Sequence, residues 1–135
     1  MVLYQSNPQG VYMDRFNNER FRLQVFCFLR DFKENLLQNR AYFYKHQKNL
    51  ETLIELGLTC RDQDEILLSL QLEDYSSGPE PDMYHSGQVF WVFGKQIEGV
   101  ELYLKLKIVS QAGEEYAVCI SFHAAEYPLE YPFRK

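Results

Sequence analysis

Cysteine is scarce in this chain, and its spacing excludes two common uses of the thiol. The three cysteines, Cys27, Cys60 and Cys119, are odd in number, far apart and outside any Cys-x-x-Cys pattern. A disulfide framework or a cysteine zinc site needs paired thiols at defined spacings. We therefore expect reduced, mostly buried thiols in an intracellular protein.

Long apolar runs are also missing. The sequence contains no stretch of 18 apolar residues, and its first residues do not combine a basic segment with an apolar run. Membrane-spanning helices and secretory signals need those features. We expect a cytoplasmic protein without a membrane partner.

The common signatures of cofactor-dependent enzymes are absent as well. The sequence has no phosphate-binding Walker loop, no Gly-x-Gly-x-x-Gly, no His-Glu-x-x-His and no Gly-x-Ser-x-Gly. Its three histidines, His46, His85 and His123, fall on different predicted elements without the spacing of metal ligands. The sequence thus predicts neither a cofactor nor a metal site.

Positive charge is in short supply except near the start of the chain. The net charge is −5, yet residues 1–50 carry eight Lys and Arg against four Asp and Glu. Residues 51–85 carry one Arg against nine acids. Attraction to a nucleic acid would have to come from a local basic patch, because the chain as a whole is acidic.

The residues that are present predict one α+β domain. The 135 residues include 46% apolar and 24% charged side chains, which is ordinary globular composition. The turn-forming segment Asn7-Pro8-Gln9-Gly10 predicts an irregular lead-in over residues 1–13. We expect four parts after it: a mainly helical half at 14–75, a loop at 76–88, an antiparallel meander at 89–123 and a tail at 124–135.

The first helix is expected from Asp14 to about Leu37. Its apolar residues recur at spacings of three and four, and basic residues fall between them. The basic side is either a surface for RNA or a partner, or simply the solvated face of a helix packed on the core, which we favour. The apolar positions are Phe21, Val25, Phe28, Leu29, Phe32 and Leu36.

Shorter elements complete the helical half. Residues 41–44 are β-prone and predict an edge strand. Asn49 is expected to cap a short helix that ends at Gly57. Thr59 and Asp62 have the form of a capping box, which predicts a helix running to about Leu70.

Three strands are expected in the second half, at 89–93, 102–109 and 116–123. In the second strand Leu104, Leu106 and Ile108 alternate with polar residues. In the third, we expect the inward residues to be Val118, Ile120 and Phe122, and the outward ones to be Cys119, Ser121 and His123. Connections of hairpin length make the meander antiparallel.

The polar face of this meander carries the one candidate for chemistry. If the apolar faces coincide, Tyr103, Lys105 and Lys107 share a surface with Ser121 and His123. Metal-free RNA cleavage needs such a set, because a base must deprotonate a ribose 2′-hydroxyl, cations must stabilise the phosphate, and an acid must protonate the leaving oxygen. The alternative is an ordinary solvent-facing sheet surface, on which Tyr and Lys are common.

An ordered series of short segments resembles the MqsR family of mRNA-interferase toxins over roughly residues 50–123. These segments are Leu56-Gly57-Leu58-Thr59, Glu65 to Leu70, Asp74-Tyr75, Trp91 to Lys95, Glu101 to Leu106 and Ile120 to His123. The resemblance implies a RelE-like fold, in which N-terminal helices pack on a small twisted antiparallel sheet. It also implies a metal-independent endoribonuclease that cleaves mRNA as the toxin of a type II toxin–antitoxin system, and an antitoxin protein that masks it.

Carried over by position, the resemblance makes Tyr103, Lys105 and His123 the catalytic residues and Lys107, Lys95 and Ser121 RNA-binding residues. His123 stands where the family pattern has a lysine. Ser76-Ser77 replaces a basic residue expected after Asp74-Tyr75, and Val92 replaces a polar residue expected after Trp91. The alternative function is a non-catalytic RNA- or protein-binding module that keeps the same fold.

Overall fold

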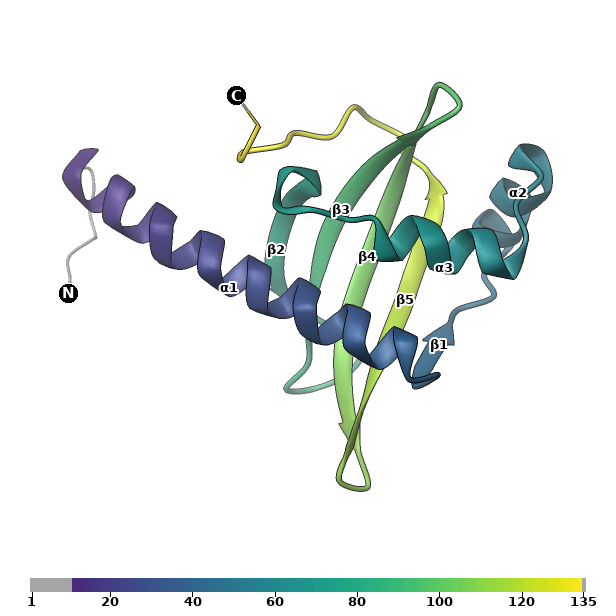
Figure 1. The fold of residues 1–135 in the computed structure, drawn as a ribbon, viewed down its shortest axis with the longest axis horizontal. Coiled ribbons are helices and arrows are strands. Elements are labelled where there is room, and N and C mark those ends of the chain that lie inside the picture. The colour runs from purple at the N-terminus through teal and green to yellow at the C-terminus, as the bar shows by residue number, and fades with distance from the viewer. Residues whose placement is uncertain (1–10, 135) are drawn as a thin grey trace.

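The computed structural model describes residues 11–134, with side chains from residue 19 onward. Residues 1–10 of the predicted lead-in at 1–13 lie outside the described residues, and the remainder is wrong because α1 already begins at Val11. Three helices precede most of a five-stranded sheet, which confirms the α+β class (Figure 1). The elements are α1 (Val11–Leu37), β1 (Ala41–Phe43), α2 (Gln47–Leu56), α3 (Cys60–Leu68), the 3-10 turn η1 (Leu72–Asp74), β2 (Tyr75–Pro81), β3 (Val89–Ile97), β4 (Val100–Gln111) and β5 (Glu114–Ala124).

The sheet has the strand order β1-β5-β4-β3-β2. Strands β3, β4 and β5 pair antiparallel, as the meander prediction required, and β2 also pairs antiparallel with β3. The short edge strand β1 was predicted at the right place, but it pairs parallel with β5. The sheet is therefore mixed and not purely antiparallel, because β1, the first strand in the sequence, lies beside β5, the last, and runs in the same direction.

The hydrophobic core lies between one face of this sheet and the helices. In Figure 1, α1 and α3 cross in front of the sheet, and α2 lies beyond β5 at its edge. The predicted apolar face of α1 supplies Val25, Leu29, Phe32 and Leu36 to the core. Leu104 and Leu106 of β4 and Phe93 of β3 meet them and are fully buried. The other face of the sheet has no helix on it among the described residues, and we call it the open face.

Two tight hairpins make the central strands longer than predicted. The β3–β4 loop consists of Glu98 and Gly99, and the β4–β5 loop of Ala112 and Gly113. All four residues have positive φ, which is the two-residue turn that matches the twist of paired strands. The short turns let hydrogen bonding continue to the ends of all three strands.

One expectation about β5 is wrong. A β-bulge between Lys105 and Leu106 pairs Ser121 with Lys105 and Cys119 with Leu106, so that Ile120 is the extra residue. In the part of β5 that precedes Ile120, the residues expected to face the core lie on the open face, and those expected on the open face lie in the core. Ala117 and Cys119 enter the core, whereas Val118 lies opposite Lys107 on the open face.

Two local predictions in the first half are corrected. Helix α2 starts at Gln47 with His46 as its N-cap residue, so Asn49 is a buried residue inside the helix rather than its cap. Part of the expected 76–88 loop is strand β2, which pairs with β3 through two irregularities in register. The capping box of Thr59 and Asp62 and the left-handed Gly57 at the end of α2 are confirmed.

The cysteines are free, but only Cys119 is buried, while Cys27 is half-buried and Cys60 is exposed. Burial raises the pKa of the Cys119 thiol far above its ordinary value. The expectation of mostly buried thiols thus holds for one of the three.

The C-terminal tail runs from the end of β5 back across the top of the sheet (Figure 1). Glu101 fixes it by accepting hydrogen bonds from the backbone N–H of Leu129 at 3.1 Å and from the hydroxyl of Tyr131 at 2.6 Å. Farther on, Phe133 stacks on Tyr75 at a ring-centroid distance of 5.1 Å. The tail therefore closes one end of the sheet and places its rings in fixed positions.

Candidate active site on the open face of the sheet

Strands β4 and β5 bring four predicted site residues together. Tyr103 lies directly opposite His123, and Lys105 lies opposite Ser121. All four side chains point away from the core, because their neighbours Leu104 and Phe122 are buried in it. Each is half-buried, so the group lines a surface that a substrate can reach.

His123 is held in one orientation and presents one free ring nitrogen. Its ring stacks on Tyr103 with centroids 5.4 Å apart and an interplanar angle of 20°. Its Nδ1 lies 2.9 Å from the backbone oxygen of Ala124, which can only accept a hydrogen bond. Nδ1 therefore carries the hydrogen, and in the neutral ring the lone pair is on Nε2. A nitrogen in that state can act as a base.

The neighbours of His123 differ in what they offer to a reacting phosphate. Burial, reinforced by the negative charge of Glu80, raises the pKa of Tyr103, so its phenol carries its proton at neutral pH and holds it more tightly than a free tyrosine does. The Lys105 ammonium lies 4.0 Å from the centroid of the Phe90 ring. This cation–π contact orients the charge without neutralising it. The face thus combines a base, a proton donor and a cation.

Asn49 of α2 holds the strand that carries Ser121 and His123. Its side-chain amide donates to the backbone oxygens of Tyr44 and Ile120, both at 3.0 Å, and its Oδ1 accepts from the N–H of Phe122 at 2.9 Å. These bonds fix the backbone at the extra residue Ile120 and at Phe122, and we call them the Asn49 clasp. The N–H of Ala124 then donates to the hydroxyl of Thr52 at 3.3 Å. Two side chains of α2 therefore take the place of a neighbouring strand where β1 has ended.

Two hollows meet at His123. One, of about 490 Å³, is lined by residues of α2 together with His46, Ser121 and His123. The other, of about 350 Å³, is lined by Tyr103, His123 and the start of the tail, including Tyr127 and Leu129. Lys48 borders both hollows and forms an ion pair with Glu126. The tail thus forms a wall beside His123 and leaves its ring half-exposed.

Lys107 is on the predicted face but is not available to a substrate phosphate. Its side chain is 2% exposed, and its ammonium donates to Asp82 and to the side-chain oxygen of Gln88, each at 2.7 Å. This hydrogen bond is the main reason that the pKa of Asp82 falls to about 2. The charge of Lys107 is therefore compensated by the loop that follows β2.

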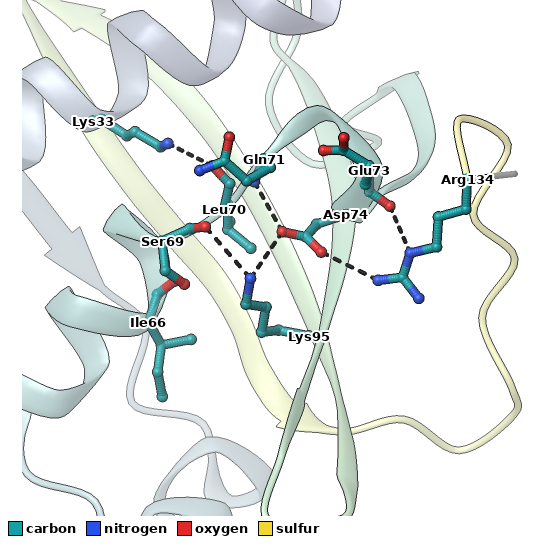
Figure 2. Close-up of polar contacts among 9 residues, drawn as sticks. All are labelled: Lys33, Ile66, Ser69, Leu70, Gln71, Glu73, Asp74, Lys95 and Arg134. Carbon is teal, nitrogen blue, oxygen red and sulfur yellow. Dashed lines mark hydrogen bonds and ion pairs between the residues drawn. The ribbon is translucent and has the colours of Figure 1, made fainter.

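Lys95 lies on the other side of the sheet from His123. It pairs with Leu102 in β3–β4, and its ammonium contacts Asp74 at 3.1 Å and the backbone oxygen of Ser69 at 3.4 Å. Figure 2 shows this cluster, in which Asp74 also binds Arg134 of the tail at 3.2 Å. Lys95 thus joins η1 to the sheet and is separated from the residues of the open face.

Sequence reasoning missed Lys48, Glu126 and His46 as neighbours of the candidate site. They come from the start of α2 and from the tail, which no strand alternation could relate to β5. The one usable signal was the concentration of Lys45, His46 and Lys48 just after the predicted edge strand.

The described residues contain no group of three or more His, Cys, Asp or Glu arranged to hold a metal ion. Among their helices, none has the length and apolar character needed to cross a bilayer. Comparison of the chain with family models, with curated proteins and with solved structures found no match.

Proposed function

We propose that this protein is an endoribonuclease that cleaves mRNA without a metal ion, and that it acts as the toxin of a type II toxin–antitoxin system. The observation that carries the proposal is the convergence of Tyr103, Lys105 and His123 on one accessible surface, with Nε2 of His123 unoccupied. The resemblance to MqsR toxins names the same three positions from the sequence.

The proposed reaction is transfer of the RNA phosphate to the neighbouring 2′-oxygen. Nε2 of His123 removes the proton from the 2′-hydroxyl, and the 2′-oxygen forms a bond to phosphorus. The bond from phosphorus to the 5′-oxygen breaks, and that oxygen takes the phenolic proton of Tyr103. Lys105 stabilises the negative charge of the phosphate in the transition state. The products are a 2′,3′-cyclic phosphate and a 5′-hydroxyl.

The test is cleavage of an RNA oligonucleotide in excess EDTA by the purified protein and its variants. His123→Ala should lower the rate by about 10²–10⁴-fold, the usual contribution of a general base. Lys105→Ala should lower it by about 10²–10³-fold, as expected for a charge-stabilising group. Tyr103→Phe has a matched control in Tyr84→Phe, because Tyr84 is 91% exposed and lies in the loop between β2 and β3.

Two results would contradict the nuclease proposal. One is equal cleavage by wild-type protein and a folded His123→Ala variant purified in the same way, which would identify a contaminating nuclease. The other is activity that disappears in EDTA and returns with Mg²⁺. Inducible expression with and without the adjacent gene tests the toxin assignment, which predicts growth arrest only when the antitoxin is missing.

One observation favours the alternative of a non-catalytic binding module. Ser77 pairs with Val92, and Val92 pairs with Lys105, so the two departures from the family pattern lie side by side next to Lys105 on the open face. Val92 is 4% exposed and offers no polar group there. The alternative predicts RNA or antitoxin binding with no cyclic phosphate product.

A further inference from the structure

A third hollow lies on the open face, at the opposite end of β5 from the tail. It encloses about 760 Å³ and is the largest of the three that we describe. Three tyrosines line it, Tyr42 and Tyr44 from the β1 segment and Tyr116 from β5, and none of its lining residues is acidic. Gln88, Ser110 and Gln111 add polar groups to its lining.

The aromatic rings continue from this hollow toward His123. Tyr42 and Tyr44 contact each other edge to face with centroids 5.8 Å apart, and Tyr44 contacts His46 in the same way at 5.3 Å. His46 then lines the hollow that contains Ser121 and His123. A row of rings thus joins the large hollow to the candidate active site.

Exposure and charge along this row suit a single strand of nucleic acid. Tyr42 is 60% exposed, and its ring is available for stacking. Lys45 is exposed beside the row, and Lys48 and Lys105 border the candidate site. Proteins that bind single strands combine aromatic platforms for the bases with cations for the backbone. A volume of several hundred Å³ is sufficient for a nucleobase.

We propose that Tyr42, Tyr44 and His46 form a stacking track for single-stranded RNA, in which the tyrosine-lined hollow holds a base of the strand whose phosphate lies at His123. This inference rests on the proposed function for the position of the cleaved phosphate. The side-chain amide of Gln111, and the amide nitrogen of Gln88, whose oxygen accepts from Lys107, supply hydrogen-bonding groups for the polar edge of that base. The track makes the substrate an unpaired RNA longer than a dinucleotide.

Binding of a fluorescent 2′-O-methyl RNA oligonucleotide, which lacks the free 2′-hydroxyl needed for cleavage, tests the track directly. Tyr42→Leu and Tyr44→Leu should each weaken binding by about tenfold, since one stacked base contributes on the order of 1–3 kcal/mol. Tyr84→Leu is the matched control and should bind like the wild type. Three lysines lie at the track. The logarithm of the association constant should therefore fall linearly with the logarithm of the salt concentration, with a slope of about −2.

Equal affinity of the two track variants and the wild-type protein would overturn the track. So would a wild-type protein that fails to bind the oligonucleotide at low salt, and the hollow would then be assigned to a protein partner. Thermal unfolding of each variant shows whether a loss of RNA binding reflects misfolding. If Tyr42→Leu misfolds, Tyr42→Phe, which keeps the ring, should bind the oligonucleotide like the wild type.

Cleavage assays separate failure of the track from failure of the nuclease. If His123→Ala abolishes cleavage while the tyrosine variants bind and cut a long RNA normally, the track is wrong and the nuclease stands. If the tyrosine variants lose binding but the wild-type protein cleaves nothing, the track stands and the nuclease is wrong. Where both hold, the tyrosine variants should lose more of their activity on a long single-stranded RNA than on a dinucleotide, because only the long substrate reaches the track.

Discussion

Replacing Asn49 with alanine should destabilise the protein far more than its position near the start of a short helix suggests. The side chain is 3% exposed and makes three hydrogen bonds, all to the backbone. Removing it leaves the oxygens of Tyr44 and Ile120 and the N–H of Phe122 without that partner. A net contribution of about 0.5–1.5 kcal/mol for each bond gives a loss of about 2–4 kcal/mol. The better helix propensity of alanine offsets only about 0.5 kcal/mol.

The size of the loss translates into a measurable shift of the melting temperature. An unfolding entropy of about 2.1 cal/mol/K per residue gives about 0.3 kcal/mol/K for 135 residues. A loss of about 3 kcal/mol should therefore lower Tm by about 10 °C. Gln47→Ala on the same helix is the control, because its partner is the exposed Glu51 and its effect should stay within about 0.5 kcal/mol.

Amide hydrogen exchange localises the effect. Asn49→Ala should accelerate exchange at Phe122, whereas Thr52→Val, which removes the bond from Ala124, should act at Ala124 instead. The reasoning is refuted if Asn49→Ala melts within about 2 °C of the wild type, or if the amide of Phe122 keeps its protection. Either result would show that the bulge is maintained without the Asn49 clasp.

Three further predictions follow from individual contacts. Asp82→Asn should lower the free energy of unfolding by about 3–5 kcal/mol, because it leaves the buried Lys107 ammonium without its carboxylate partner. The folded pKa of Asp82 is lowered to about 2, so the contribution of its charge to stability, about 2 kcal/mol, should be present above pH 4 and be lost as the pH falls toward 2. Denaturant titrations that show no such difference between wild type and variant would contradict this. Gly94→Ala should displace the tail and lower the free energy of unfolding by about 1–3 kcal/mol, because a Cβ there would overlap the Tyr131 hydroxyl and lie 2.7 Å from Cδ1 of Leu129. An unchanged Tm together with unchanged chymotrypsin cleavage of the tail would disprove it. Glu126→Gln should tighten binding of the uncleavable RNA several-fold by releasing Lys48 from its ion pair, and weaker or equal binding would count against Lys48 as a phosphate ligand.

Features that depend on neighbours in the sequence were predictable. The capping box of Thr59 and Asp62 and the left-handed Gly57 need only residues within a few positions, and both are confirmed. The alternation of β4 placed Leu104 in the core and Tyr103 and Lys105 on the other face, because a slip of one residue would expose every large apolar side chain.

Features that depend on distant partners were not predictable. Ser76-Ser77-Gly78-Pro79 has the composition of a loop, yet pairing with β3 and a bond from the Tyr75 hydroxyl to the backbone oxygen of Gly78 at 2.6 Å hold it as a strand. Lys107 has the pattern of an exposed strand residue, but Asp82 approaches it from a loop 25 residues earlier. Local sequence contains no signal for either contact.

The bulge at Ile120 shows why the candidate site and the core of this protein depend on one another. Without it, a strand that keeps Phe122 in the core would also turn Ala117 and Cys119 toward the open face and Val118 inward. The bulge allows Ser121 and His123 to face Lys105 and Tyr103 while Cys119 stays buried below them. Since Asn49 binds the bulge from α2, a residue of the helical half holds the segment of β5 next to His123 in place. A change that loosens this clasp should therefore lower stability and misplace His123 together, so the placement of His123 on the open face requires the helices to be packed against the sheet.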